Sequence, residues 1–146
     1  MPFVKVYIHF VWSTKNRTPY LNTPELRKKV WLHIRENAKI KGIFIDLVNG
    51  YQDHCHCLVS LGIDQNISQV VQLIKGESSF WINKNKLTKE KFGWQDEYFA
   101  ISISESAIDP VRNYIMNQEN HHKKKSYQEE YDDLVNRNDE CDENGE

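Results

Sequence analysis

The densest group of side chains that could do chemistry is the run Asp53-His54-Cys55-His56-Cys57. As a string it could hold Zn²⁺ or Cu⁺ through mixed sulfur and nitrogen ligands. On a strand, successive side chains point to opposite faces, so His54 and His56 share one face and the cysteines share the other. One ion cannot easily use both sets. We expect reduced thiols in the core and a candidate metal site on the imidazoles, although two histidines on a solvated face fit the same pattern.

A second group follows on a predicted helix, where Tyr114 and Gln118 are four residues apart and lie on one exposed flank. Tyrosine is a weak nucleophile at neutral pH because its pKa is near 10, so it needs a cation or base beside the phenol. A cation on the histidine pair, reached by the Gln118 carbonyl oxygen, would position and neutralise a phosphodiester. A helical tyrosine alone is more often a packing or surface residue, so the hypothesis depends on the pairing with His54 and His56.

The hydropathy pattern predicts the elements that must position these residues. Strand periodicity covers residues 3–12, 43–48, 54–61 and 97–104, with an Asn49-Gly50 turn between the middle two, and helical periodicity covers residues 23–42, 66–85, 109–125 and 126–135. The order strand, helix, strand, strand, helix, strand is typical of an α+β fold. We expect a ferredoxin-like split βαβ antiparallel sheet with helices on one face, followed by C-terminal helices.

The composition is that of a globular protein, with 39% hydrophobic and 27% charged residues. No apolar run approaches the roughly 20 residues that cross a bilayer, and the first strand begins without a signal peptide, so we expect a cytoplasmic protein with no membrane partner.

The formal net charge of -2 hides an uneven distribution. Residues 1–125 hold 18 Lys+Arg against 12 Asp+Glu, whereas residues 126–146 hold one arginine against nine acids. We therefore divide the chain into a catalytic domain over residues 1–125, a helix over 126–135 that docks on it, and an acidic disordered tail over 136–146. The basic body is compatible with a nucleic-acid partner.

The combined pattern resembles a known family, the single-tyrosine HUH transposases of the insertion-sequence 200/605 group and the REP-associated tyrosine transposases. The resemblance covers about residues 3–135. It is carried by His54-Cys55-His56 on a strand, Tyr114-x-x-x-Gln118 on a helix, and the segments VWSTKNR, IKGESS, GWQDEYFAISIS and NYIMNQENHHKKKSYQEEY. The motif normally has a large aliphatic residue where Cys55 stands. Because that side chain points away from the metal, we expect a packing cost and an intact site.

The resemblance implies a role for each site residue. His54, His56 and Gln118 would bind a divalent cation, Mg²⁺ or Mn²⁺, and Tyr114 would attack single-stranded DNA to form a 5′-phosphotyrosine link. The reaction would need no nucleotide cofactor. The family also implies recognition of DNA hairpins and a homodimer in which the tyrosine helix of one subunit commonly serves the metal of the other.

Contacts to DNA are predicted at five further positions. His121 and His122 could contact the scissile phosphate or the DNA backbone, or could instead favour the dipole at a helix end. Lysine and arginine side chains at Lys15, Arg17 and Lys75 could neutralise phosphates, or could simply be solvated. Two other functions stay open: a domesticated single-stranded DNA- or RNA-binding module without catalysis, and a metal-binding protein that uses Cys55 and Cys57.

Overall fold

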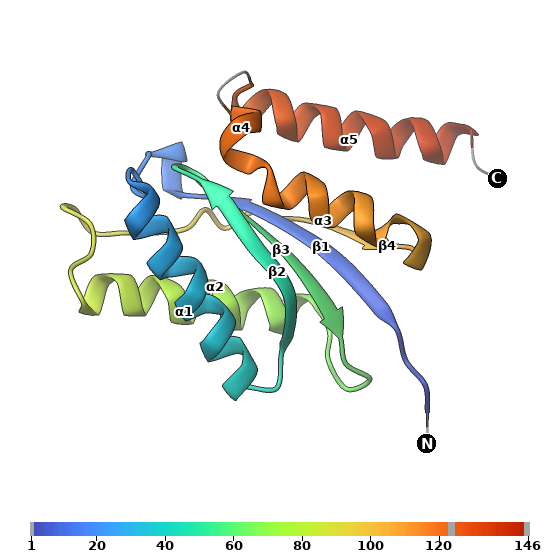
Figure 1. The fold of residues 1–146 in the computed structure, drawn as a ribbon, viewed down its shortest axis with the longest axis horizontal. Helices are drawn as coiled ribbons and strands as arrows, with labels where there is room; N and C mark the ends of the chain where they lie inside the picture. The colour runs from blue at the N-terminus through green and yellow to red at the C-terminus, as the bar shows by residue number, and fades with distance from the viewer. Residues whose placement is uncertain (1, 123–124, 145–146) are drawn as a thin grey trace.

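A four-stranded antiparallel sheet lies between two sets of helices (Figure 1). The computed structural model describes residues 2–122 and 125–144, with residues 138–144 described by their backbone alone. The strand order is β2-β3-β1-β4, which confirms the predicted α+β, ferredoxin-like fold. The elements are β1 (Val6–Ser13), η1 (Lys15–Arg17), α1 (Pro24–Ile40), β2 (Phe44–Tyr51), β3 (His54–Leu61), α2 (Ile67–Lys84), β4 (Phe99–Ile103), η2 (Glu105–Ala107), α3 (Ile108–Met116), α4 (Gln118–His122) and α5 (Tyr127–Asn144).

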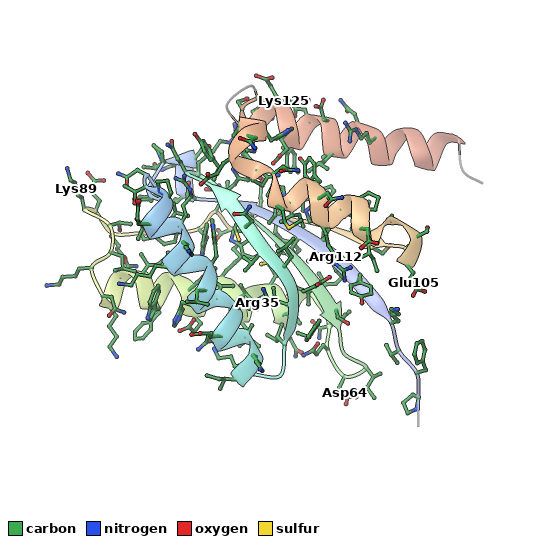
Figure 2. All side chains as sticks on the ribbon, in the orientation of Figure 1. Arg35, Asp64, Lys89, Glu105, Arg112 and Lys125 are labelled. Carbon is green, nitrogen blue, oxygen red and sulfur yellow. The ribbon has the colours of Figure 1, made fainter. Side chains whose placement is uncertain are left out.

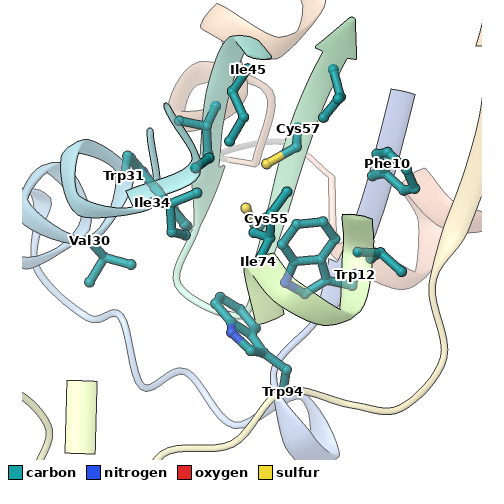
Figure 3. Packing of buried hydrophobic residues seen from close by; sticks show 14 of the residues in the cluster. Phe10, Trp12, Val30, Trp31, Ile34, Ile45, Cys55, Cys57, Ile74 and Trp94 are labelled. Carbon is teal, nitrogen blue, oxygen red and sulfur yellow. The ribbon is translucent and has the colours of Figure 1, made fainter. Parts of the chain in front are cut away.

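The main core lies between one face of the sheet and helices α1 and α2. Alternate residues of the two central strands point to it, because side chains on a strand alternate between faces. Cys55 and Cys57 are among them: both are free, fully buried and surrounded by apolar side chains (Figure 3). The two thiols and the two imidazoles lie on opposite faces of β3, so one ion cannot easily be held by both pairs, and the metal-binding function that would use both cysteines is disfavoured.

Helices α3, α4 and α5 cover the opposite face, which carries His9, His54 and His56 (Figure 1). Leu58 packs there with Ile108 and Ile115 in a smaller apolar cluster. Arg112 ties α3 to β2, since its Nε donates to Asp46 Oδ2 at 2.8 Å (Figure 2). All three histidines are buried rather than solvated. None of the helices in the described ranges is both long and apolar enough to span a membrane.

The hairpin that carries the histidines turns later than the sequence predicts. The Asn49-Gly50 pair lies inside β2, and the turn falls at residues 52–53. A Cβ added to Gly50 would stand 2.2 Å from the His54 carbonyl oxygen, so the glycine is needed for close backbone approach rather than for a turn. The Asn49 side chain donates to the Ile115 carbonyl oxygen at 2.8 Å, near the end of α3. Both residues therefore serve the packing of the hairpin.

The C-terminal part differs from the prediction in two ways. The predicted single helix over 109–125 breaks at Asn117, and Lys123 and Lys124 lie outside the described residues. Helix α5 continues to Asn144, where we expected a disordered tail from residue 136, and residues 145–146 lie outside the described residues. Adding a residue to an existing helix costs much less free energy than forming its first turn. The first turns of α5, which dock on the body, can therefore stabilise the helical conformation of the acidic residues that follow.

Candidate metal and tyrosine site

Strand β3 and helix α4 bring the predicted metal ligands together. His54 and His56 are two residues apart on β3, and both side chains are fully buried. Gln118, the first residue of α4, is also fully buried, and its Oε1 lies 3.1 Å from His54 Nε2. Gln118 was expected on an exposed flank of the helix, but it is buried and faces His54. The break at Asn117 ends α3 directly before the glutamine that faces the histidines.

Helix α3 places the predicted nucleophile beside the same histidines. The Tyr114 ring lies 5.7 Å from the His56 ring, measured between centroids, and 6.4 Å from the His9 ring. The phenol is half-buried. Within a single chain, the tyrosine thus lies next to the histidines that it would serve.

Glu130 of α5 stands at the centre of this cluster and was missed by the sequence analysis. Its Oε1 lies 2.9 Å from His56 Nε2 and 3.3 Å from His54 Nε2, while its Oε2 accepts the Tyr114 hydroxyl at 2.5 Å. The side chain is 1% exposed. A signal was present, because Glu130 lies three residues after Tyr127 and four before Leu134, on the side of the helix that those residues predict to be buried.

His121 and His122 also face Glu130. Their Nε2 atoms lie 3.1 Å and 3.2 Å from its Oε2, and His122 Nε2 is 3.0 Å from Gln118 Oε1. Both histidines lie in the last turn of α4, as the helix-end alternative expects, and both also contact Glu130. The donors His54, His122 and Glu130 are close enough to one another to hold one metal ion.

Two further side chains hold the histidines in place. Asp53 Oδ1 lies 2.9 Å from His54 Nδ1, and His9 Nε2 lies 2.9 Å from His56 Nδ1. A histidine that binds a cation through Nε2 carries its proton on Nδ1 and donates it to such an acceptor. Burial lowers the pKa of His9 to about 3, which keeps that ring neutral and able to accept. With Glu130 ionised and His56 neutral, His56 Nε2 donates to Glu130 Oε1, and His56 Nδ1 accepts from His9 Nε2. A cation bound at His56 Nε2 would replace that proton and reverse the direction of the contact with His9.

The electrostatics of the cluster keep Glu130 ionised. Burial opposes its charge, but hydrogen bonds from His122, His54 and His56 hold the pKa of this carboxyl well below its usual range. Burial lowers the pKa of His54, yet its bonds to Asp53 and Glu130 raise that pKa to about 9. For His56, burial outweighs the contact with Glu130, and its pKa falls to about 4.

The same charge acts on Tyr114. Burial, followed by the negative charge of Glu130, raises the pKa of the phenol well above its ordinary value. The phenol is therefore protonated in this state. A positive charge beside it would favour the phenolate that a nucleophilic tyrosine needs.

Comparison with known proteins places this site in a family. A sequence model of the family described as "Transposase IS200 like" matches residues 3–118. The chain belongs to the IS200-like transposase family. The matched range of this transposase contains His54, His56 and Tyr114 and ends at Gln118, whereas Glu130 lies beyond it. No curated protein matches the chain.

Two solved structures are similar to this IS200-like transposase. One is a candidate transposase from Deinococcus radiodurans r1, with a TM-score of 0.64 and 23% identity over 80% of this chain and 93% of the other. The second is a REP-associated tyrosine transposase bound to a REP hairpin, with a TM-score of 0.61 and 19% identity over 84% of this chain and 72% of the other. At these identities the likeness supports the fold. Family membership makes the protein a DNA-processing enzyme.

The two lysines predicted to contact DNA line a cavity that Tyr114 does not line. Lys15 and Lys75 line one cavity of about 430 Å³, together with Lys91 and Trp94. Lys75 donates to the Gln95 carbonyl oxygen, and burial lowers the pKa of its ammonium group. This arrangement gives the transposase a second polar surface, with three lysines around one hollow.

Arg17 is in a different place from the two lysines. Its guanidinium lies 5.7 Å from the centre of the Tyr127 ring, and that ring stacks on His54 at 4.7 Å. Arg17 thus approaches the site from the loop that follows β1, whereas Lys15 faces the cavity.

Proposed function

We propose that this transposase cleaves and rejoins single-stranded DNA with Tyr114 as the nucleophile and a divalent cation, Mg²⁺ or Mn²⁺, on His54, His56 and Gln118. The observation that carries the proposal is their convergence: Gln118 Oε1 lies 3.1 Å from His54 Nε2, and the Tyr114 ring lies 5.7 Å from the His56 ring. The three donors are polar side chains from β3 and α4 that are fully buried, and apolar packing alone does not explain why they meet.

The donor set fits a divalent cation. The amide oxygen suits Mg²⁺ or Mn²⁺, whereas the two imidazole nitrogens also suit Zn²⁺ and Ni²⁺. The ionised Glu130 beside them lowers the cost of burying a dication. When bound, the cation would polarise the phosphodiester and offset the charge that develops on it. His9 and Asp53 would keep the Nε2 atoms directed at the ion.

The chemistry asked of Tyr114 is a transesterification. Its Oη forms a bond to the phosphorus while the bond from phosphorus to the 3′ oxygen breaks, which gives a 5′-phosphotyrosine and a free 3′-hydroxyl. The phenol gives up one proton and the leaving 3′ oxygen takes one up. Attack by another 3′-hydroxyl reverses the step, so the reaction consumes no nucleotide cofactor.

The DNA partner follows from the family and from the cavity around Lys15 and Lys75. A similar REP-associated transposase is bound to a REP hairpin, and we extend hairpin recognition to this chain. We propose that lysines of this cavity contact phosphates outside the tyrosine site. A homodimer with a shared site stays a prediction, as does the cytoplasmic location. The position of Tyr114 beside His56 of the same chain favours cleavage within one subunit.

A cleavage assay tests the proposal. Purified protein is mixed with Mn²⁺ and single-stranded DNA taken from the hairpins that flank its gene, and covalent adducts are separated on a denaturing gel. We expect an adduct with wild type, none with Tyr114→Phe, and none when a chelator is added. Binding of the same strands without an adduct, unchanged in Tyr114→Phe, would contradict cleavage and favour the domesticated binding module.

A further inference from the structure

Glu130 is a buried acidic side chain inside the site, and the proposed reaction gives it a charge beside the cation but no bond to it. It comes from α5, outside the residues that match the family, yet it is as deeply buried as the histidines. An ionised carboxylate is rarely buried unless it pairs with charges or binds a metal. Its two oxygens are also used differently. Oε1 faces His54 and His56, and Oε2 faces Tyr114, His121 and His122.

The distances around Oε1 are those of neighbouring ligands on one ion. Oε1 lies 2.9 Å from His56 Nε2 and 3.3 Å from His54 Nε2, and Gln118 Oε1 lies 3.1 Å from His54 Nε2. An octahedral ion with bonds of about 2.1 Å holds adjacent ligands about 3.0 Å apart. Glu130 Oε1 thus has the spacing of a neighbouring ligand to each of the two histidine nitrogens, and Glu130, His54 and His122 lie close enough together to hold one ion.

Charge and donor type point the same way. Imidazoles that bind a cation are neutral, so two of them and an amide bring no negative charge to offset a buried dication. The carboxylate of Glu130, in contact with both imidazoles, brings one. A carboxylate also raises the share of oxygen donors, which Mg²⁺ and Mn²⁺ prefer to nitrogen.

We propose that Glu130 is a fourth protein ligand of the cation through Oε1, and that its Oε2 holds the Tyr114 hydroxyl beside the ion. This inference rests on the proposed function, because it assumes the cation on His54, His56 and Gln118. It makes the docking of α5 part of the metal site. The opposite arrangement is a carboxylate that fills the place of the cation and has to leave when the cation binds.

Mn²⁺ binding to the full chain separates these arrangements. Free Mn²⁺ is followed by electron paramagnetic resonance during titration of wild type, Glu130→Gln and Glu129→Gln. The last is a matched control, since Glu129 is the neighbouring, exposed acid on the same helix and loses the same charge. We expect Glu130→Gln to weaken Mn²⁺ binding at least about tenfold and Glu129→Gln to change it less than twofold. Unchanged or tighter binding by Glu130→Gln would overturn the assignment.

A second measurement covers the case in which Glu130→Gln fails to fold. Crystals of wild type soaked in Mn²⁺ locate the ion by its anomalous scattering. An ion about 2.2 Å from Glu130 Oε1 supports the proposal, and an ion on the histidines with the carboxylate displaced overturns it.

The cleavage assay keeps this proposal separate from the proposed function. Loss of Mn²⁺ affinity in Glu130→Gln without any DNA adduct in wild type would leave Glu130 as a ligand and remove the transposase chemistry. An adduct that forms in wild type and Glu130→Gln with the same Mn²⁺ dependence would leave the chemistry and remove Glu130 from the ligand set.

Discussion

The two faces of strand β3 come from the same short run of residues, but apolar side chains cover one face and polar and charged side chains cover the other. Cys55 and Cys57 contact apolar side chains from α1 and α2. The packing of this face is stabilised by complementary shape and by the removal of apolar surface from water. His54 and His56 meet Gln118 and the ionised Glu130, and their face depends on hydrogen bonds and charge. Every buried polar group on the second face needs a partner, so it is rigid only while its network is complete.

This difference predicts that one face controls stability and the other controls chemistry. A substitution on the apolar face should change the free energy of unfolding and leave the activity of each folded molecule unchanged. A substitution on the polar face should reduce the activity of each molecule that remains folded. The predictions below test that separation, beginning with the largest effect.

His56→Ala removes a buried imidazole from the polar face. We expect the rate of adduct formation to fall at least about a thousandfold, or about 4 kcal/mol of transition-state stabilisation, because the cation loses a ligand. The rate is measured at saturating Mn²⁺ by denaturing gel, and circular dichroism checks the fold. An adduct rate within tenfold of wild type would show that this face does not hold the reacting cation.

Ile34→Ala makes the matching change on the apolar face. Ile34 lies in α1 and is 2% exposed, so the variant should lose about 2–5 kcal/mol of unfolding free energy in urea. The adduct rate per folded molecule should stay at the wild-type value. A large loss of rate in protein that remains folded would mean that the two faces are coupled through the sheet.

How much the sequence predicts also differs between the faces. Period-two alternation in β1 and β3 identifies the apolar core, because every second residue of these strands is apolar and buried on the same face. The residue pattern also places His54, His56, Tyr114 and Gln118 in one site. The turn was predicted at the wrong position because Asn49 and Gly50 are explained by tertiary contacts. Asn49 bonds to Ile115, and Gly50 allows the close approach of β3. Local turn preferences carry no information about such contacts.

For Glu130 the sequence offered one weak signal, its position on the side of the helix that carries Tyr127 and Leu134, and the charge of the segment obscured that signal. Glu130 lies 74 residues from His56 in sequence, inside a segment whose nine acids suggested a solvated surface. Only the docking of α5 separates this acid from its neighbours. The average charge of a segment therefore says little about the one residue that turns inward.

Asp53→Asn tests the contacts behind the histidines. The amide keeps the size of the side chain but removes the charge that holds His54 Nδ1 at 2.9 Å, so Mn²⁺ affinity should fall about 10–100-fold. Asp64→Asn, at an exposed aspartate, is the control and should bind as wild type does. Calorimetric titration measures both. Equal affinities would mean that the backbone alone orients this ring.

The smallest functional effect is expected from the double variant Cys55→Ala/Cys57→Ala. Each change replaces a fully buried thiol with a methyl group among apolar neighbours, and we expect a combined loss of about 2 kcal/mol in urea unfolding. Mn²⁺ affinity should stay within twofold of wild type, since the sulfur atoms face α1 and α2 and the imidazoles face away. A thiol-dependent affinity would require a metal on the apolar face and would end the division between the two sides of β3.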